Sequence, residues 1–502
     1  MNDETEQPGA QSANSSPLLR AGWRFDNSYA RLPKSFHSPV NPTPVAGPQL
    51  ILLNQPLAQS LGLDPHILGG HDTATIFAGN QVPSGATPIA QAYAGHQFGN
   101  LTRLGDGRAI LLGEHLTPTG ERFDIQLKGA GPTPYSRRGD GRAALGPMLR
   151  EYIISEAMHA LGIPTTRSLA VAATGEPVYR EQPLPGAVLT RVAASHLRVG
   201  TFEYFAATGD FDSLRLLTDY TIERHFPKRA ESENPALGLL EEVSERQASL
   251  IAHWMRVGFV HGVMNTDNMA LSGETIDYGP CAFIDAYDPS AVFSSIDHHG
   301  RYAFGQQPGI AAWNLARFAE ALLPVLHPEP DTAVTFANEV LESFGDRFRQ
   351  HWLAVMRGKL GLFAPDPEDD SLVEELLRWM QETRADYTHT FRNLRPIPAS
   401  GSTPPSDVSF VAWHERWIKR LAQQPQPPAE VLRLMNAHNP VVIPRNHEVE
   451  AVLNAATSVN DLAPLGKLLA SLARPYEETG QPDTLKNPPP PGTPICRTFC
   501  GT

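Results

Sequence analysis

The stretch His261-Gly262-Val263-Met264-Asn265-Thr266-Asp267-Asn268, followed by Asp277-Tyr278-Gly279, decides how this chain is expected to fold. Asn268 offers a carboxamide oxygen and Asp277 a carboxylate. These are the hard oxygen ligands that Mg²⁺ prefers, usually together with substrate phosphates. An Asp-Asn pair on its own more often makes a turn. Asp277 behind it and a strand lysine upstream favour a site that holds a metal ion and a nucleotide.

This spacing resembles the catalytic and metal-binding loops of kinases. In kinases a His-Gly-Asp or His-Arg-Asp triplet begins the catalytic loop, a later Asn binds one metal ion, and an Asp-x-Gly binds the other. Here Val263 occupies the position of the catalytic aspartate, and its side chain cannot accept a proton. The resemblance therefore implies that the site holds Mg-ATP but is badly suited to ordinary phosphorylation.

The predicted strand upstream ends in Lys128. Residues 123–128 alternate between apolar and polar side chains, which indicates a strand, and residues 109–113 indicate another, joined to it by a turn. The helix predicted for residues 147–161 carries Glu151. In kinases a strand lysine touches the phosphates and pairs with a helix glutamate. We therefore expect Lys128 to pair with Glu151, although a single strand lysine is usually just a solvated edge residue.

Two copies of a Gly-Asp-Gly-Arg motif flank Lys128, at residues 105–108 and 139–142. Such turns often serve only as connections between strands. Two copies around one lysine instead predict a phosphate cradle made of backbone N–H groups and arginine side chains. Arg191 and Arg198 would add positive charge if they face the same cleft.

Composition limits the classes of partner and compartment. The formal net charge of −13 over 502 residues argues against a nucleic-acid partner. Three cysteines (Cys281, Cys496 and Cys500) are typical of a reducing compartment. We recognise no targeting signal and no apolar run of the roughly 20 residues that a membrane-spanning helix needs. We expect a cytoplasmic protein that contacts no membrane, and a monomer by default.

The order of predicted elements indicates an α+β protein with a kinase-like two-lobe fold, an N-terminal arm and a C-terminal helical extension. The arm includes a short helix predicted for residues 52–61, and its polar first 20 residues are expected to be disordered. Further helices are predicted for residues 239–257, 313–326 and 371–383. The expected divisions are residues 1–85 for the arm, 86–205 for the small lobe, 206–395 for the large lobe, and 396–502 for a linker, helical extension and proline-rich tail.

The motifs together resemble the selenoprotein O family of pseudokinases. The resemblance rests on the two Gly-Asp-Gly-Arg copies, on Leu127-Lys128-Gly129-Ala130-Gly131-Pro132, on His261 to Met269, and on Asp277-Tyr278-Gly279-Pro280, and it extends from about Trp23 to Thr502. It implies transfer of AMP from ATP, or UMP from UTP, to Ser, Thr or Tyr hydroxyls of proteins, which would include the chain itself. ATP would be held in a flipped orientation.

The resemblance also implies roles for individual residues. Asp267 would be the proton acceptor, Asn268 and Asp277 would bind Mg²⁺ or Mn²⁺, and Glu151 would pair with Lys128. The residues that would bind the nucleotide are Gly105, Gly107, Arg108, Lys128, Asp140, Gly141, Arg191 and Arg198.

Two departures from the family bear on redox regulation. Cys500 stands near the end of the chain, where some members carry selenocysteine. Phe293 stands where some bacterial members carry a cysteine that links to the C-terminal region, while Cys281 lies closer to the metal loop. A regulatory disulfide is therefore not expected.

Two other functions compete with nucleotidyl transfer. A kinase for small molecules would use the same fold, but Val263 counts against it. An ATP-binding scaffold without activity would have no need of both Asn268 and Asp277.

Overall fold

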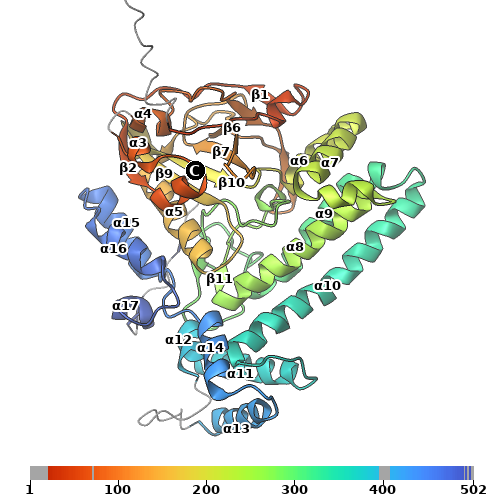
Figure 1. The fold of residues 1–502 in the computed structure, drawn as a ribbon, viewed down its shortest axis with the longest axis vertical. Coiled ribbons are helices and arrows are strands. Elements are labelled where there is room, and N and C mark those ends of the chain that lie inside the picture. Colours follow the sequence, from red (N-terminus) through yellow and green to blue (C-terminus); the bar gives the residue numbers. More distant parts are fainter. Residues whose placement is uncertain (1–20, 71–72, 395–406, 491, 494–496, 499–502) are drawn as a thin grey trace, which may run out of the picture.

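The computed structural model of the protein describes residues 21–70, 73–394, 407–490, 492–493 and 497–498. These residues form a mixed structure of helices and sheet, as the α+β prediction requires. In Figure 1 a sheet occupies one end of the molecule, long helices lie beside it, and shorter helices gather at the other end. Residues 1–20, Cys496, Cys500 and all but the last residue of the linker predicted for residues 395–407 lie outside the described residues.

The main sheet has eight strands, and all its strand pairs are antiparallel. The order is β1-β3-β6-β7-β10-β9-β2, with β8 paired to β10. Its strands are β1 (His37–Pro39), β2 (Gln49–Leu53), β3 (Ile89–Gln91), β6 (Ala109–Leu116), β7 (Arg122–Lys128), β8 (Ala143–Ala144), β9 (Arg167–Tyr179) and β10 (Pro183–Ala193). Two small sheets pair β4 (Ala94–Gln97) with β5 (Asn100–Arg103), and β11 (Phe259–Val260) with β12 (Ala282–Phe283).

Strand β7 lies in the middle of the sheet and is buried on both faces. Ile125 and Leu127 belong to an apolar core on one face. Asp124, Gln126 and Lys128 alternate with them and are equally buried, on the face where they meet charged partners. The predicted strand and its hairpin with β6 are thus confirmed, and the polar face of β7 points toward the chemistry described below.

The predicted arm supplies both edges of the main sheet, β1 and β2. The helix predicted for residues 52–61 is shorter in the structure, because Leu52 and Leu53 pair with β9 as part of β2. Asn54 then caps helix α2 (Gln55–Ser60) by accepting a hydrogen bond from the N–H of Leu57 at 3.1 Å. Pairing with a distant strand therefore overrides the helical pattern at the start of this segment.

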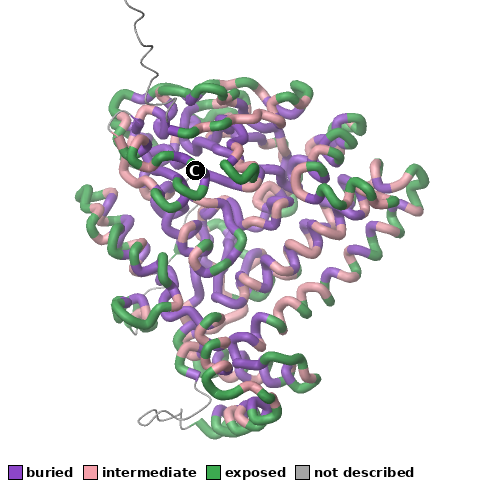
Figure 2. Tube along the Cα trace, in the orientation of Figure 1, coloured by how far each residue is buried: buried purple, intermediate pink, exposed green. Residues whose placement is uncertain are grey.

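The helices predicted around the motifs are confirmed as α5 (Leu145–Ala160), α8 (Pro235–Val257), α9 (Gln307–Leu326) and α11 (Asp369–Thr383). Each has ends within a few residues of the prediction, except at the start of α9. Helix α10 (Pro330–Leu360) follows α9. Helices α8, α9 and α10 pack on one another, and Figure 2 shows buried residues along them and through the sheet. The remaining described α-helices longer than four residues are α6 (Val199–Thr208), α7 (Phe211–His225), α12 (Tyr387–Asn393), α13 (Val408–Ala422), α14 (Pro428–His438), α15 (Asn446–Ser458) and α16 (Ala463–Leu472).

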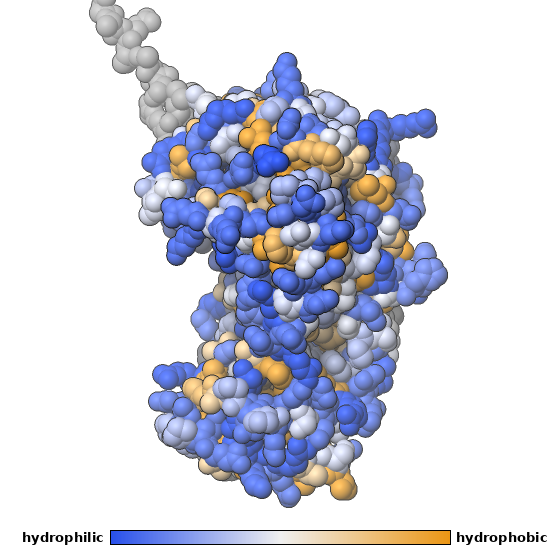
Figure 3. Space-filling view, turned by 90° about the vertical axis from the view of Figure 1, so that its right-hand side faces the viewer, coloured by the Kyte–Doolittle hydropathy of each residue, from blue (hydrophilic) through white to orange (hydrophobic). Residues whose placement is uncertain are grey.

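The C-terminal helices return to the sheet region. Helices α15 and α16 pack on α5, and Arg150 of α5 forms an ion pair with Glu450 of α15. Within the described part of the chain, none of the helices is long and apolar enough to cross a membrane. The face shown in Figure 3 is mainly hydrophilic, with scattered hydrophobic side chains, as protein surfaces usually are.

Candidate active site

A cleft of about 440 Å³ gathers the predicted site residues from both parts of the chain. The sheet region contributes the two Gly-Asp-Gly-Arg loops and Lys128, and the helical region contributes the loops that carry Asp267 and Asp277. Glu151 is the one predicted residue that does not line the cleft, because it is buried behind Lys128. The predicted residues that line it are Gly105, Gly107, Arg108, Lys128, Asp140, Gly141, Arg191, Arg198, Asp267, Asn268 and Asp277.

Four charged side chains form a compact cluster at the back of this cleft. Nζ of Lys128 donates to Oε2 of Glu151 at 2.7 Å and also to Oδ1 of Asp277. Arg191 donates through Nε to Oε1 of Glu151 at 2.7 Å and through Nη2 to Asp277 at 3.1 Å. The predicted Lys128–Glu151 pair is confirmed. Arg191 joins it because β10 lies next to β7, with Arg191 opposite Gln126.

The cluster keeps Asp277 ionised. Burial opposes the charge on this carboxylate, yet the positive charges of Lys128 and Arg191 outweigh it and hold the pKa of Asp277 well below its usual range. Asp277 also has a left-handed backbone, with φ of +67°, which is uncommon for a residue other than glycine. His261 ties the two loops together, because its Nε2–H donates to the carbonyl of Ile276 at 2.9 Å.

The pKa of Asp267 is shifted in the opposite direction from that of Asp277. Oδ1 of Asp267 is buried and has no hydrogen-bond partner among the described residues. Burial raises the pKa of Asp267 to about 7, although the nearby charge of Arg198 partly opposes this shift. A carboxyl group in this state suits a proton acceptor near neutral pH.

The donors around Asn268 and Asp277 fit a hard divalent cation. The amide Nδ2 of Asn268 donates to the carbonyl of Val263 at 3.1 Å, which directs the amide oxygen away from that carbonyl. Asn268 and Asp277 line the same cleft from adjacent loops, so a carboxamide oxygen and a carboxylate face one space. Mg²⁺ commonly binds to such a small oxygen set and completes its shell with phosphates and water.

Close packing explains why two of the predicted nucleotide-binding positions are glycine. Gly105 has a φ of +89°, and a Cβ there would collide with the ring of Tyr135. Gly141 has a φ of +65°, and a Cβ there would collide with the backbone of Gly131. The two motif loops are thus packed against the segment between them, which brings both copies to the same cleft.

Comparison with known proteins shows the family of this chain. The sequence profile of the family described as "Protein adenylyltransferase SelO" matches residues 20–473. The chain belongs to the SelO family. It is 59% identical over 481 residues to the "Protein nucleotidyltransferase YdiU" of Syntrophotalea carbinolica, which covers 96% of this chain and 98% of the relative. The proteins of the same name from Alkaliphilus metalliredigens and Geobacillus kaustophilus are 57% and 58% identical, over 97% and 96% of this chain and 99% and 100% of theirs.

The cleft of this SelO family member contains residues that the sequence did not single out. Arg180, between β9 and β10, lines the cleft and donates to Oδ2 of Asp140 at 2.8 Å. Tyr93 lies under the guanidinium of Arg198, which is 4.3 Å from the ring centre. Arg142 was visible as the end of a motif, whereas Arg180 has no local pattern around it. Contacts across strands, which a single sequence does not show, bring Arg180 and Tyr93 to the site.

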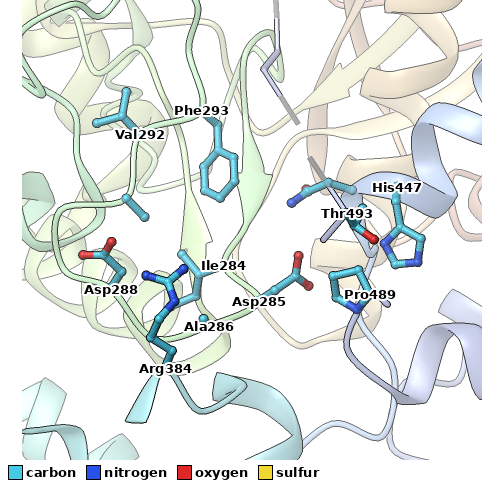
Figure 4. A pocket seen from close by; sticks show the side chains of 12 residues that line it. Ile284, Asp285, Ala286, Asp288, Val292, Phe293, Arg384, His447, Pro489 and Thr493 are labelled. Carbon is cyan, nitrogen blue, oxygen red and sulfur yellow. The ribbon is translucent and has the colours of Figure 1, made fainter. Parts of the chain in front are cut away.

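A second cavity, of about 230 Å³, lies near the C-terminal tail (Figure 4). It is lined by residues after the Asp277 loop, such as Phe293, and by His447 and Thr493. It contains none of the predicted site residues, so the cleft that gathers those residues is the candidate active site. Beside this cavity the C-terminal tail contacts Phe293, the position where some bacterial members of the resembled family carry a cysteine. The N–H of Thr498 donates to the carbonyl of Phe293 at 2.9 Å. Cys281 is buried, and burial raises the pKa of its thiol to about 12.

Proposed function

We propose that this chain transfers AMP from ATP, or UMP from UTP, to Ser, Thr or Tyr hydroxyls of proteins and releases pyrophosphate. Membership of a family of protein adenylyltransferases supports a nucleoside triphosphate substrate and protein acceptors. The acceptors would include the chain itself.

The charge of the cleft is the observation that carries this proposal. Seven basic side chains line it against four aspartates, and Val263 lines it at the position of the kinase base. Attack at the α-phosphorus expels pyrophosphate, whose growing negative charge needs cations along the β- and γ-phosphates. Arg198 is suited to this role, because its Nε is buried and has no hydrogen-bond partner among the described residues. The basic side chains are Arg108, Lys128, Arg137, Arg142, Arg180, Arg191 and Arg198.

Each predicted residue then has a chemical role. The two motif loops with Lys128, Arg191 and Arg198 would bind the triphosphate, and Glu151 would hold Lys128 in place. Asn268 and Asp277 would hold Mg²⁺ or Mn²⁺, which would neutralise phosphate charge when bound. The acceptor oxygen would form a bond to the α-phosphorus, the bond to the pyrophosphate oxygen would break, and Asp267 would take the hydroxyl proton.

We further propose that the architecture is a kinase-like pair of lobes. Residues 86–205 would form the small lobe and residues 206–395 the large lobe, with the arm before them and the helical extension after them. The position of the cleft supports this division, because its lining comes from both segments.

The test uses purified protein, Mg²⁺ and ATP labelled at either the α- or the γ-phosphate, with Asp277→Ala as the control. We expect label from the α-phosphate on the chain itself and on added proteins, and none in the variant. Label from γ-ATP alone would instead indicate a kinase. Nucleotide binding without any label would indicate an ATP-binding scaffold.

A further inference from the structure

The hairpin of β4 and β5 lies against the loop that carries Asp267. The N–H of His96 donates to Oγ1 of Thr266 at 2.7 Å. Gly95, the residue before it, lies so close to Asp267 that a Cβ there would collide with the carboxylate. The hairpin therefore covers Asp267 on one side and holds the preceding residue by a hydrogen bond.

Glu203 of α6 joins this contact from a third segment. Its Oε2 accepts the hydroxyl hydrogen of Thr266 at 2.5 Å, and its Oε1 lies 2.5 Å from Nδ1 of His96. Glu203 and Thr266 are both buried, at 3% and 0% exposure. Hydrogen bonds to a buried carboxylate are stronger than those between neutral groups. The hydroxyl of Thr266 thus connects the hairpin, α6 and the catalytic loop.

This connection matters because no described residue forms a hydrogen bond with Oδ1 of Asp267. The direction of that carboxylate must then come from its backbone and from close packing. Gly200 of α6 packs on the other side, where a Cβ would collide with the carbonyl of Ala94 and lie 3.5 Å from the Cα of Asp267. Of the two residues next to Asp267, Thr266 bonds to the hairpin and to α6, whereas the side chain of Asn268 bonds to the carbonyl of Val263 within the same loop.

We propose that Thr266, held by Glu203 and His96, is a positioning residue that aims the Asp267 carboxylate at the acceptor hydroxyl. This inference rests on the proposed function, in which Asp267 takes the proton of that hydroxyl. A proton acceptor must lie within hydrogen-bond reach of the proton it removes. A displacement of about 1 Å can slow a reaction about 100-fold.

The test compares Thr266→Val, which keeps the shape but removes the hydroxyl, with Thr266→Ser, which keeps the hydroxyl. Each change is made alone and together with Asp267→Asn, and transfer of α-labelled AMP to the chain and to added protein is followed in single turnovers. Thr221→Val is the matched control, because Thr221 is equally buried and its hydroxyl donates to the carbonyl of Leu217 at 2.7 Å, within α7.

We expect Thr266→Val to slow transfer about 10- to 100-fold, with the KM for ATP changed by less than about 3-fold. Thr266→Ser should restore most of the rate, and Thr221→Val should leave it unchanged. In the Asp267→Asn background, Thr266→Val should cause no further loss, because the group that it positions is already gone.

Three results would overturn the inference alone. The first is full activity of Thr266→Val, and the second is an equally large loss of rate from Thr266→Val in the Asp267→Asn background. The third is a rise in the KM for ATP with no change in the rate of transfer. A wild-type protein that transfers no α-label would overturn the proposed function, and this inference with it. The wild-type control therefore separates the two failures.

Discussion

Two aspartates in one cleft have opposite surroundings. Asp277 faces Lys128 and Arg191 and has a pKa well below its usual range, because the two cations outweigh the effect of burial. Asp267 is covered by the β4–β5 hairpin, and burial raises its pKa to about 7. The first carboxylate keeps its charge at any physiological pH, whereas the second gains and loses a proton near neutrality. The difference separates a group suited to holding cations from a group suited to accepting a proton.

The largest effect on AMP transfer is expected from removing the Asp277 carboxylate, which stays ionised at any physiological pH. Asp277→Ala should lower transfer of α-labelled AMP about 1,000-fold, because it deletes both a proposed metal ligand and the partner of two cations. Asp219→Ala, an exposed aspartate of α7, is the control and should retain full activity. Activity of Asp277→Ala within about 10-fold of wild type would show that the carboxylate is not part of the reaction.

The second effect is on stability, at the other end of the same cluster. Glu151 is buried and pairs with both Lys128 and Arg191. Glu151→Ala should lower the free energy of unfolding by about 3 kcal/mol, since two buried cations lose a partner although Asp277 remains near both. Denaturant unfolding with nucleotide absent measures this loss. Glu151→Gln keeps an acceptor oxygen and should lose less; equal losses would mean that packing, and not charge, is what matters.

The third effect concerns Asp267 and pH. The folded pKa of about 7 lies above the value of about 3.9 in an unfolded chain. Between these values the folded protein binds more protons than the unfolded one, so this residue lowers stability as pH rises toward 7 and adds no further change above it.

Asp267→Asn removes that dependence. In EDTA and without nucleotide, we expect the stability of the variant relative to wild type to increase by about 2 kcal/mol between pH 5 and pH 8. Thermal unfolding at both pH values measures the difference, with Asp219→Asn as the control. A pH-independent difference would mean that the Asp267 carboxyl titrates in its ordinary range.

The sequence predicted the parts of this comparison that have local patterns. The alternation of β7 placed Lys128 on a strand, the helical spacing placed Glu151 behind it, and the loop motifs placed Asp267, Asn268 and Asp277 together. In each case a short periodic segment or a fixed spacing carries the information.

Other parts depend on contacts between distant segments. The three residues whose hydrogen bonds meet at Thr266 lie far apart in the chain, since Glu203 is 63 residues and His96 is 170 residues from Thr266. The edge strand β2 forms only because β9 is available to pair with it. Neither segment contains a local signal for its partner, so a single sequence does not reveal these contacts.

The smallest effect is expected at the exposed rim of the cleft. Asp140 is 46% exposed, its Oδ2 accepts from Arg180 at 2.8 Å, and its Oδ1 accepts from the N–H of Arg142 at 2.9 Å. The hydrogen bond from Arg180, more than any other contact, lowers the pKa of Asp140, so the group is ionised at neutral pH. Solvent screens an exposed pair, which contributes less than about 1 kcal/mol to stability.

Asp140→Asn should therefore leave thermal unfolding almost unchanged. It should raise the KM for ATP about 3-fold, because the motif loop loses part of its order beside the phosphates. Arg180→Gln should cause the same rise in the KM for ATP, because it breaks the same Arg180–Asp140 pair. In the double variant the two effects should not add. Additive effects would mean that Asp140 and Arg180 act on the nucleotide separately, and an unchanged KM in both would place this rim outside the nucleotide site.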